Sequence, residues 1–226
     1  MRPMKELSHI TVLCVGNRLM LDDGAGPAVF DHLTSSYAFP PEVELVDAGC
    51  MTMALLPKVM ASDYVIAVDA IDGTGAKPGT VVRFAPEDIA GHDVMQSLHD
   101  MRLVDLINAA ELMGGSCSGM CFGVQAENMS PAVVTEGLTP AVFDALGLLC
   151  DAVLAHLWEL GVRFSHADGT AFVPPMGASK VCGAPCSDGR SDELEFSATL
   201  ASRASDAAQD DDEMSFTERC NADEQC

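Results

Sequence analysis

Acidic residues stand directly after two apolar segments, at positions where a buried strand would end. Asp22 and Asp23 lie between glycines after residues 11–15, and Asp69 follows residues 64–68. A surface turn explains one acid in such a place, but two close carboxylates repel each other and are tolerated when a cation or proton lies between them. These residues suggest a bound cation, a phosphoryl group or an activated water molecule, with turn formation as the structural alternative.

A histidine of suitable chemistry follows further along the chain. His99 lies in the sequence S-L-H-D, near the start of a helix that we predict over residues 98–112. The helix dipole disfavours a cation at this end, which leaves the imidazole neutral and available as a ligand or base. An ordinary surface position is the alternative for His99, and His92, the competing candidate, is interpreted as a loop residue.

The elements that would position these residues alternate along the chain. Continuous apolar segments rich in β-branched residues predict five strands, at residues 9–15, 43–46, 64–68, 79–84 and 121–124. Helical spacing, with Pro27 and Pro140 at first helical positions, predicts helices between them. We therefore expect an α/β fold, a three-layer sandwich with a mostly parallel, twisted five-stranded sheet flanked by helices on both faces.

In such a sheet, functional groups gather at the carboxyl ends of the strands. Asp23 and Asp69 should therefore lie on the same edge, although they are far apart in the sequence. For Asp22 and Asp72 we expect only the shaping of turns. The segment at residues 79–84 follows a glycine-rich loop and is expected to be an antiparallel strand at the edge of the sheet.

Composition excludes several classes of function. The net charge is −22, from 34 acidic and 12 basic residues, which disfavours binding to nucleic acid or to an anionic membrane. No apolar run approaches the roughly 18–20 residues that span a bilayer, and the N-terminus lacks the apolar core of a signal peptide. We expect a cytoplasmic protein whose nine cysteines are free thiols.

The chain divides by composition near residue 165. We expect residues 1–164 to form the α/β domain and residues 165–226 to form an acidic, cysteine-containing, disordered tail, because glycine, serine, alanine, proline and acids cannot bury enough apolar surface. Cys182 and Cys186 in this tail lack a standard zinc-binding spacing to the two later cysteines.

Other chemistries find little support in the sequence. The patterns G-x-S-x-G, G-x-x-x-x-G-K-[ST] and H-E-x-x-H are absent. A receiver-like module with Mg²⁺ and a phosphoacceptor aspartate would also place acids after two strands. It would need a lysine after residues 121–124, and the four lysines lie elsewhere, at positions 5, 58, 77 and 180.

The sequence G-N-R-L-M-L-D-D-G-A-G-P at residues 16–27 resembles the signature of the hydrogenase maturation proteases. These endopeptidases remove the C-terminal extension of the [NiFe]-hydrogenase large subunit. Four further stretches match in order: V-D-A-G at 46–49, V-D-A-I at 68–71 with P-G-T at 78–80, S-L-H-D-M-R-L-V-D-L at 97–106, and F-G-V-Q-A-E at 122–127 with G-L-T-P at 137–140. The resemblance covers residues 9–162.

The resemblance implies a site and a mechanism. Asp23, Asp69 and His99 match the metal-contacting residues of the family, which would act on nickel carried by the substrate, with no permanent cofactor and no serine or cysteine nucleophile. It implies that the partner is the nickel-loaded large-subunit precursor, and we expect a monomer. Substrate-approach roles would fall to Gly24, Gly26, Asp47 and Gly49.

Two departures from the family pattern affect this site. Asp23 stands where the family often has glutamate, in a form that resembles the branch serving formate-linked hydrogenases, and Leu98 stands where some relatives have proline. A maturation chaperone that binds the precursor without cutting it would carry the same residues, so it remains an alternative alongside the receiver-like module.

Overall fold

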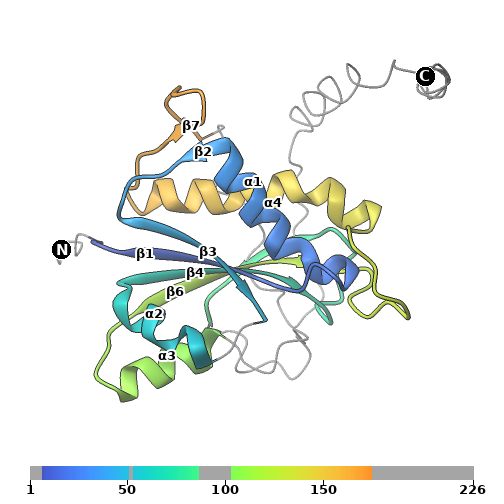
Figure 1. Ribbon diagram of the computed structural model, residues 1–226, viewed down its shortest axis with the longest axis horizontal. Helices are drawn as coiled ribbons and strands as arrows, with labels where there is room; N and C mark the ends of the chain where they lie inside the picture. Colours follow the sequence, from blue (N-terminus) through green and yellow to red (C-terminus); the bar gives the residue numbers. More distant parts are fainter. Residues whose placement is uncertain (1–6, 51–52, 87–102, 175–226) are drawn as a thin grey trace, which may run out of the picture. The chain divides into compact units, whose positions relative to one another are not determined.

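The centre of the molecule is a five-stranded sheet. The computed structural model describes residues 7–50, 53–86 and 103–174. In the sheet, the strand order is β3-β1-β4-β6-β5, and all neighbours are parallel except β5 against β6 (Figure 1). The strands are β1 (Ile10–Val15), β3 (Val43–Gly49), β4 (Tyr64–Ile71), β5 (Val81–Phe84) and β6 (Ser118–Gln125). The expected antiparallel edge strand is confirmed as β5.

Helices cover both faces of this sheet, which confirms the expected three-layer α/β sandwich. Two helices, α1 (Ala25–Ser36) and α4 (Pro140–Glu159), lie on one face, while α2 (Leu56–Ala61) and α3 (Leu103–Leu112) lie on the other (Figure 1). Two short 3₁₀ turns, η1 (Leu21–Gly24) and η2 (Met53–Leu55), precede α1 and α2.

The burial of β1 shows why its sequence is continuously apolar. All six of its residues are buried. Val12 and Cys14 belong to the apolar cluster beneath α1 and α4, whereas Leu13 and Val15 belong to the cluster beneath α2 and α3. Alternate side chains of a strand point to opposite faces, so a strand covered on both faces needs apolar residues throughout.

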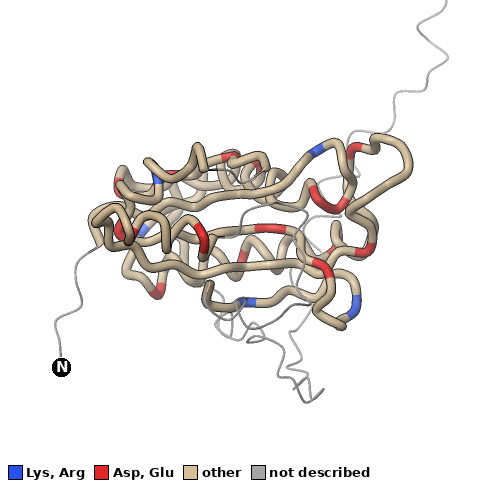
Figure 2. The backbone as a smooth tube through the Cα atoms, turned by 90° about the horizontal axis from the view of Figure 1, so that it is seen from below, with Lys and Arg blue, Asp and Glu red and all other residues tan. Residues whose placement is uncertain are grey.

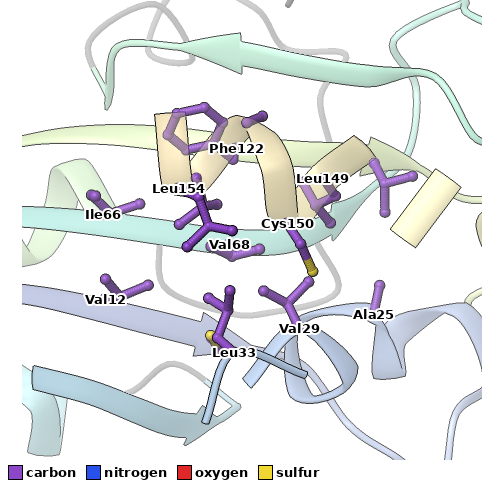
Figure 3. Packing of buried hydrophobic residues seen from close by; sticks show 14 of the residues in the cluster. Val12, Ala25, Val29, Leu33, Ile66, Val68, Phe122, Leu149, Cys150 and Leu154 are labelled. Atoms are coloured by element: carbon purple, nitrogen blue, oxygen red, sulfur yellow. The ribbon is translucent and has the colours of Figure 1, made fainter. Parts of the chain in front are cut away.

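The larger of the two apolar clusters joins the sheet to α1 and α4 (Figure 3). Its centre contains Val12, Ile66, Val68 and Phe122 from the strands, Ala25, Val29 and Leu33 from α1, and Leu149, Cys150 and Leu154 from α4.

Helix α4 corrects one expectation from composition. Within the described residues it is the one helix long and apolar enough to cross a membrane, although we expected no stretch of this kind. More than half of it is buried inside the domain, with Val142, Leu149 and Val153 packed in the core. Its apolar composition is therefore explained by its packing on the sheet and beside α1.

The folded chain also extends beyond residue 164, where we expected the tail to begin. Strand β7 (Ser165–His166) pairs antiparallel with β2 (Tyr37–Ala38). Phe172 is buried and stacks on Phe164, with 4.5 Å between the ring centroids. The expectation of disorder is thus wrong for residues 165–174, because one aromatic side chain anchors a stretch whose composition is otherwise polar and small.

Candidate functional site

The loop after β1 folds back on itself at Gly16, at the carboxyl edge of the sheet. Gly16 has a φ of +143°, and a Cβ atom there would lie 1.9 Å from the carbonyl oxygen of Asp23. Next to it, the backbone N–H of Asn17 donates to that same carbonyl at 3.0 Å, and the N–H of Gly16 donates to the carbonyl of Gly49 at 3.0 Å. The loop is therefore closed against the ends of β1 and β3, and only glycine fits at position 16.

Asp22 holds this loop to a distant part of the chain. Its carboxylate is fully buried. The Oδ2 atom accepts the backbone N–H groups of Glu127 and Asn128, at 2.9 and 2.8 Å, and the Thr139 hydroxyl at 3.0 Å. The Oδ1 atom accepts the backbone N–H of Thr139 at 2.7 Å. We expected Asp22 to shape a local turn, and it lies in the 3₁₀ turn η1; the prediction missed that its side chain is also a clamp across more than 100 residues of sequence.

Thr139 has two roles at this clamp. It occupies the N-cap position of α4. Its side chain makes no capping hydrogen bond, and its hydroxyl donates to the carboxylate of Asp22. The start of α4 is therefore fixed to the site loop through this threonine.

Backbone pairing adds to the clamp. The N–H of Leu21 donates to the carbonyl of Thr135 at 2.8 Å, and the N–H of Thr135 donates to the carbonyl of Leu19 at 3.0 Å. These bonds make Met20 and Thr135 an isolated parallel bridge. Leu21 takes a left-handed conformation, with a φ of +54°, which is costly for a branched residue and which the surrounding bonds hold in place.

The two predicted acidic site residues lie on adjacent elements. Asp23 is 2% exposed and follows Asp22 in η1, which lies close to β4. Asp69 is partly buried and is inside β4, opposite Gly123 of β6. We expected the strand to end before Asp69, but the ladder continues to Ile71 because the residues after Asp69 are apolar and buried. Both acids belong to the carboxyl half of the sheet, as predicted.

Asp69 lies on a definite face of the sheet. Val65, Ala67 and Ile71, which share its parity along β4, belong to the apolar cluster covered by α2 and α3. Because alternate residues of a strand share a face, Asp69 belongs to the face that α3 covers.

The third predicted residue, His99, lies outside the described residues, as does His92. His99 precedes Leu103, the first residue of α3, by four positions in the sequence. Within the described ranges, no group of three histidine, cysteine or acidic side chains is arranged to hold a metal ion.

The residues predicted for substrate approach have different surroundings. Gly26 is buried, and a Cβ atom there would lie 1.9 Å from the carbonyl oxygen of Val15, so its small size serves the packing of α1 on β1. Gly24 is buried with the Cα atom of Arg18 3.4 Å from its Cβ position. Both glycines are packed against the protein itself, and their predicted role in substrate approach stays a prediction. Gly49 has a φ of +53° and open space around its Cβ position.

Asp47 is engaged by an arginine that sequence reasoning did not single out. Arg18 forms ion pairs with Asp31 of α1 and with Asp47 of β3, the latter at 2.9 Å, and donates to the carbonyl of Pro27 at 3.3 Å. The hydrogen bonds to Asp31 and then Asp47 raise the pKa of Arg18 above its usual value. Arg18 thus ties the site loop to α1 and β3, although each exposed pair is a weak interaction.

A buried glutamine orders the loop after β4. Gln125, at the end of β6, accepts hydrogen bonds at Oε1 from the backbone N–H and hydroxyl of Thr74. Its Nε2 donates to the Asp72 carboxylate at 3.1 Å and to the Ala126 carbonyl at 3.0 Å. The position of Gln125 at the end of a buried strand is the sequence signal that could have identified it.

Comparison with known proteins identifies the family. The family model described as hydrogenase maturation protease matches residues 27–156. The chain belongs to the hydrogenase maturation protease family. The matched region includes Asp69 and His99 and begins after Asp23, so the family match by itself does not contain the clamp residue Asp22 or its neighbour.

Individual relatives of this maturation protease support the same family assignment. The hydrogenase 2 maturation protease of Escherichia coli (strain K12) is 32% identical over 157 residues, covering 69% of this chain and 94% of the relative. The hydrogenase expression/formation protein HupD of Rhodobacter capsulatus is 32% identical over 144 residues, covering 59% of this chain and 68% of the relative.

Solved structures share the fold of this maturation protease. The hydrogenase maturating endopeptidase HybD from E. coli superposes with a TM-score of 0.64 and 30% identity, covering 72% of this chain and 99% of the neighbour. A [NiFe] hydrogenase maturation protease from Thermococcus kodakarensis, which is 22% identical, has the same fold with a TM-score of 0.53. The match covers 66% of this chain and 98% of the neighbour. The chain is accordingly an endopeptidase with the α/β sandwich of its relatives.

Proposed function

We propose that this endopeptidase removes the C-terminal extension from the immature [NiFe]-hydrogenase large subunit after nickel insertion, with Asp23, Asp69 and His99 as the contacts to the nickel. The observation that carries the proposal is the placement of Asp23 and Asp69 on adjacent elements, η1 and β4, at the carboxyl half of the sheet. The names of the relatives support the substrate class. Nickel belongs to the substrate, and the protein needs no permanent cofactor.

The placement of α3 supports the inclusion of His99. This helix covers the same face of the sheet to which Asp69 belongs, and His99 is four residues before its first described residue. Two carboxylates and one imidazole form the oxygen and nitrogen ligand set that borderline divalent ions such as nickel accept. The three side chains would coordinate the nickel of the precursor and so hold the scissile peptide bond at the carboxyl edge of the sheet.

The chemistry that we propose is attack by water on the peptide carbonyl, with one carboxylate or the substrate's own metal ion activating the water. The described thiols support a mechanism without a cysteine nucleophile. Cys14, Cys117 and Cys150 are buried, and burial raises the pKa of Cys117 to about 11 and that of Cys150 to about 12. Their thiols are therefore protonated at neutral pH and unreactive. Cys50 is exposed at the end of β3 and has to be tested directly.

We further propose that the protein acts as a cytoplasmic monomer on a folded precursor. Its high net negative charge of −22 supports solubility and disfavours self-association and binding to polyanions.

The experiment is incubation of the purified protein with nickel-loaded and nickel-free large-subunit precursor, followed by mass analysis of the precursor's C-terminus. We expect trimming of the nickel-loaded precursor alone. Asp69→Asn and His99→Ala should leave the fold intact, judged by circular dichroism and thermal unfolding, and abolish trimming. Cys50→Ser and the exposed helical control Glu111→Gln should trim at the wild-type rate.

Each outcome decides a separate point. If both Asp69→Asn and His99→Ala still trim the precursor, the site assignment is wrong. Equal trimming of nickel-free precursor would show that recognition of the precursor does not require nickel. Tight binding without any trimming by the wild-type protein would favour the chaperone alternative.

A further inference from the structure

Apolar side chains are exposed on two loops beside the acidic site. Leu19 is 45% exposed, and Val133 and Val134 are 75% and 65% exposed. Single exposed apolar residues are ordinary in soluble proteins. The bridge between Met20 and Thr135 brings together the two segments that carry these residues, with the N–H of Thr135 donating to the carbonyl of Leu19. Leu19, Val133 and Val134 are called the loop patch below.

The loop patch is fixed relative to Asp23. One of its loops carries Asp22 and Asp23, and the other is bonded to the Asp22 carboxylate through the N–H groups of Glu127 and Asn128. A polypeptide bound to the patch would therefore be held close to the acidic site by a surface that is already ordered before binding. Such preorganisation lowers the entropy cost of binding.

Acidic residues outnumber basic ones in the two segments that carry the loop patch, and Arg18, the basic residue next to Leu19, is paired with Asp31 and Asp47. Glu127 and Glu136 are exposed on the same loop, and Asp144 is exposed in the second turn of α4. No lysine or arginine occurs in the sequence between Arg102 and Arg163. Along the described backbone, acidic residues are spread over many segments and basic residues are few (Figure 2). An apolar centre with an acidic margin is complementary to apolar side chains accompanied by lysine or arginine.

We propose that the loop patch binds a segment of the precursor polypeptide that presents apolar side chains next to lysine or arginine. The inference rests on the proposed function and deepens it: the protease recognises protein surface at the patch in addition to the nickel at Asp23. Two other occupants fit the charge less well. A second copy of the chain has the same net charge of −22, and residues 175–226 contain 12 acidic and 4 basic residues.

The test compares two matched pairs of exposed apolar residues. Val133→Ser with Val134→Ser removes most of the patch. Leu112→Ser with Met113→Ser is the control, because these two side chains are 90% and 64% exposed at the end of α3. Met113 comes five residues before β6, which begins at the edge of the sheet opposite its carboxyl edge. Trimming of nickel-loaded precursor is measured over a range of precursor concentrations. From the apolar area lost, we expect the patch variant to raise KM about ten-fold, with kcat within about two-fold of wild type. The control variant should match wild type in both.

A charge variant supplies an independent arm that leaves the apolar residues in place. Glu136→Lys should raise KM, and added salt should raise the KM of the wild-type protein more than that of Glu136→Lys, because screening weakens attraction between exposed charges. Circular dichroism and thermal unfolding confirm that each variant is folded.

Failure of this inference is distinguishable from failure of the proposed function. If the wild-type protein does not trim the precursor, the proposed function is wrong. If it trims and the patch variant keeps the wild-type KM, or the control variant changes equally, the patch inference alone is overturned. A wild-type dimer that the patch variant converts to a monomer, seen by size-exclusion chromatography with light scattering, would identify a second copy as the occupant and also overturn it.

Discussion

Replacing Asp22 by asparagine tests whether the clamp holds the site loop in place. The carboxylate accepts three backbone N–H groups and one hydroxyl in a fully buried position. Asparagine is nearly isosteric but has one acceptor atom. With its oxygen toward Glu127 and Asn128, its amide group faces the N–H of Thr139, so that one hydrogen bond to a charged acceptor becomes a contact between two donors.

The expected loss follows from that single change. A hydrogen bond to a charged group contributes about 1.5–3 kcal/mol, and an unsatisfied buried donor costs about 1–3 kcal/mol. We therefore expect Asp22→Asn to lower the free energy of unfolding by about 3 kcal/mol. Asp22→Ala, which loses all four bonds, should lower it by about 5 kcal/mol. Urea unfolding followed by circular dichroism measures both values.

The same variant should also lose activity, since Asp23 is carried on the loop that the clamp holds. We expect Asp22→Asn to trim nickel-loaded precursor more slowly even at temperatures where it is fully folded. Asp168→Asn is the control, because among the described residues the Asp168 carboxylate accepts hydrogen bonds within an exposed turn, from the N–H and hydroxyl of Thr170. An Asp22→Asn protein with wild-type stability and a wild-type trimming rate would refute the assignment of Asp22 as a clamp.

Three further variants or conditions test other parts of the structure. Gly26→Ala should destabilise the fold by about 3 kcal/mol or more, seen as a lower urea midpoint, because the new Cβ would lie 1.9 Å from the Val15 carbonyl oxygen. Phe172→Ala should cost about 3 kcal/mol in the same assay, and no loss would show that residues 165–174 do not belong to the fold. Burial, followed by the charge of Arg83, lowers the pKa of His156 below its ordinary value of 6.5. The unfolded chain therefore binds this proton more readily, so stability should fall as the pH drops below about 6.5, and His156→Gln should reduce that fall. A pH dependence identical in the variant would contradict this assignment.

The sheet and its main helices were predictable because burial leaves a local pattern in the sequence. A strand covered on both faces, such as β1, must be apolar at every position, and Pro140 marks the first turn of α4. The edge to which Asp23 and Asp69 belong was predictable because both acids follow predicted strands of a mostly parallel sheet, whose carboxyl ends lie at one edge. The end of β4 was misjudged because Asp69 interrupts the apolar run, although the backbone ladder continues through it.

The contacts of Asp22 were not predictable from local pattern. Three of its four partners are backbone N–H groups, which every residue except proline has, so no residue type at positions 127–139 reveals them. Phe172 escaped prediction for a related reason, because a single aromatic residue in a polar stretch produces no periodicity. Arg18 was passed over because a lone arginine in a loop identifies no partner.

The long sequence separation across the clamp also bears on how the protein is made. Asp22 lies 105 to 117 residues before the groups that hold it. During synthesis the acidic loop is among the first parts of the domain to leave the ribosome, yet it acquires its anchors only after the start of α4 has followed. Closing a loop of this length costs conformational entropy, and non-local contacts slow folding. An incomplete chain therefore has the acidic residues without the geometry that makes them a site, and the ability to cut peptide bonds arises only when the domain is nearly complete.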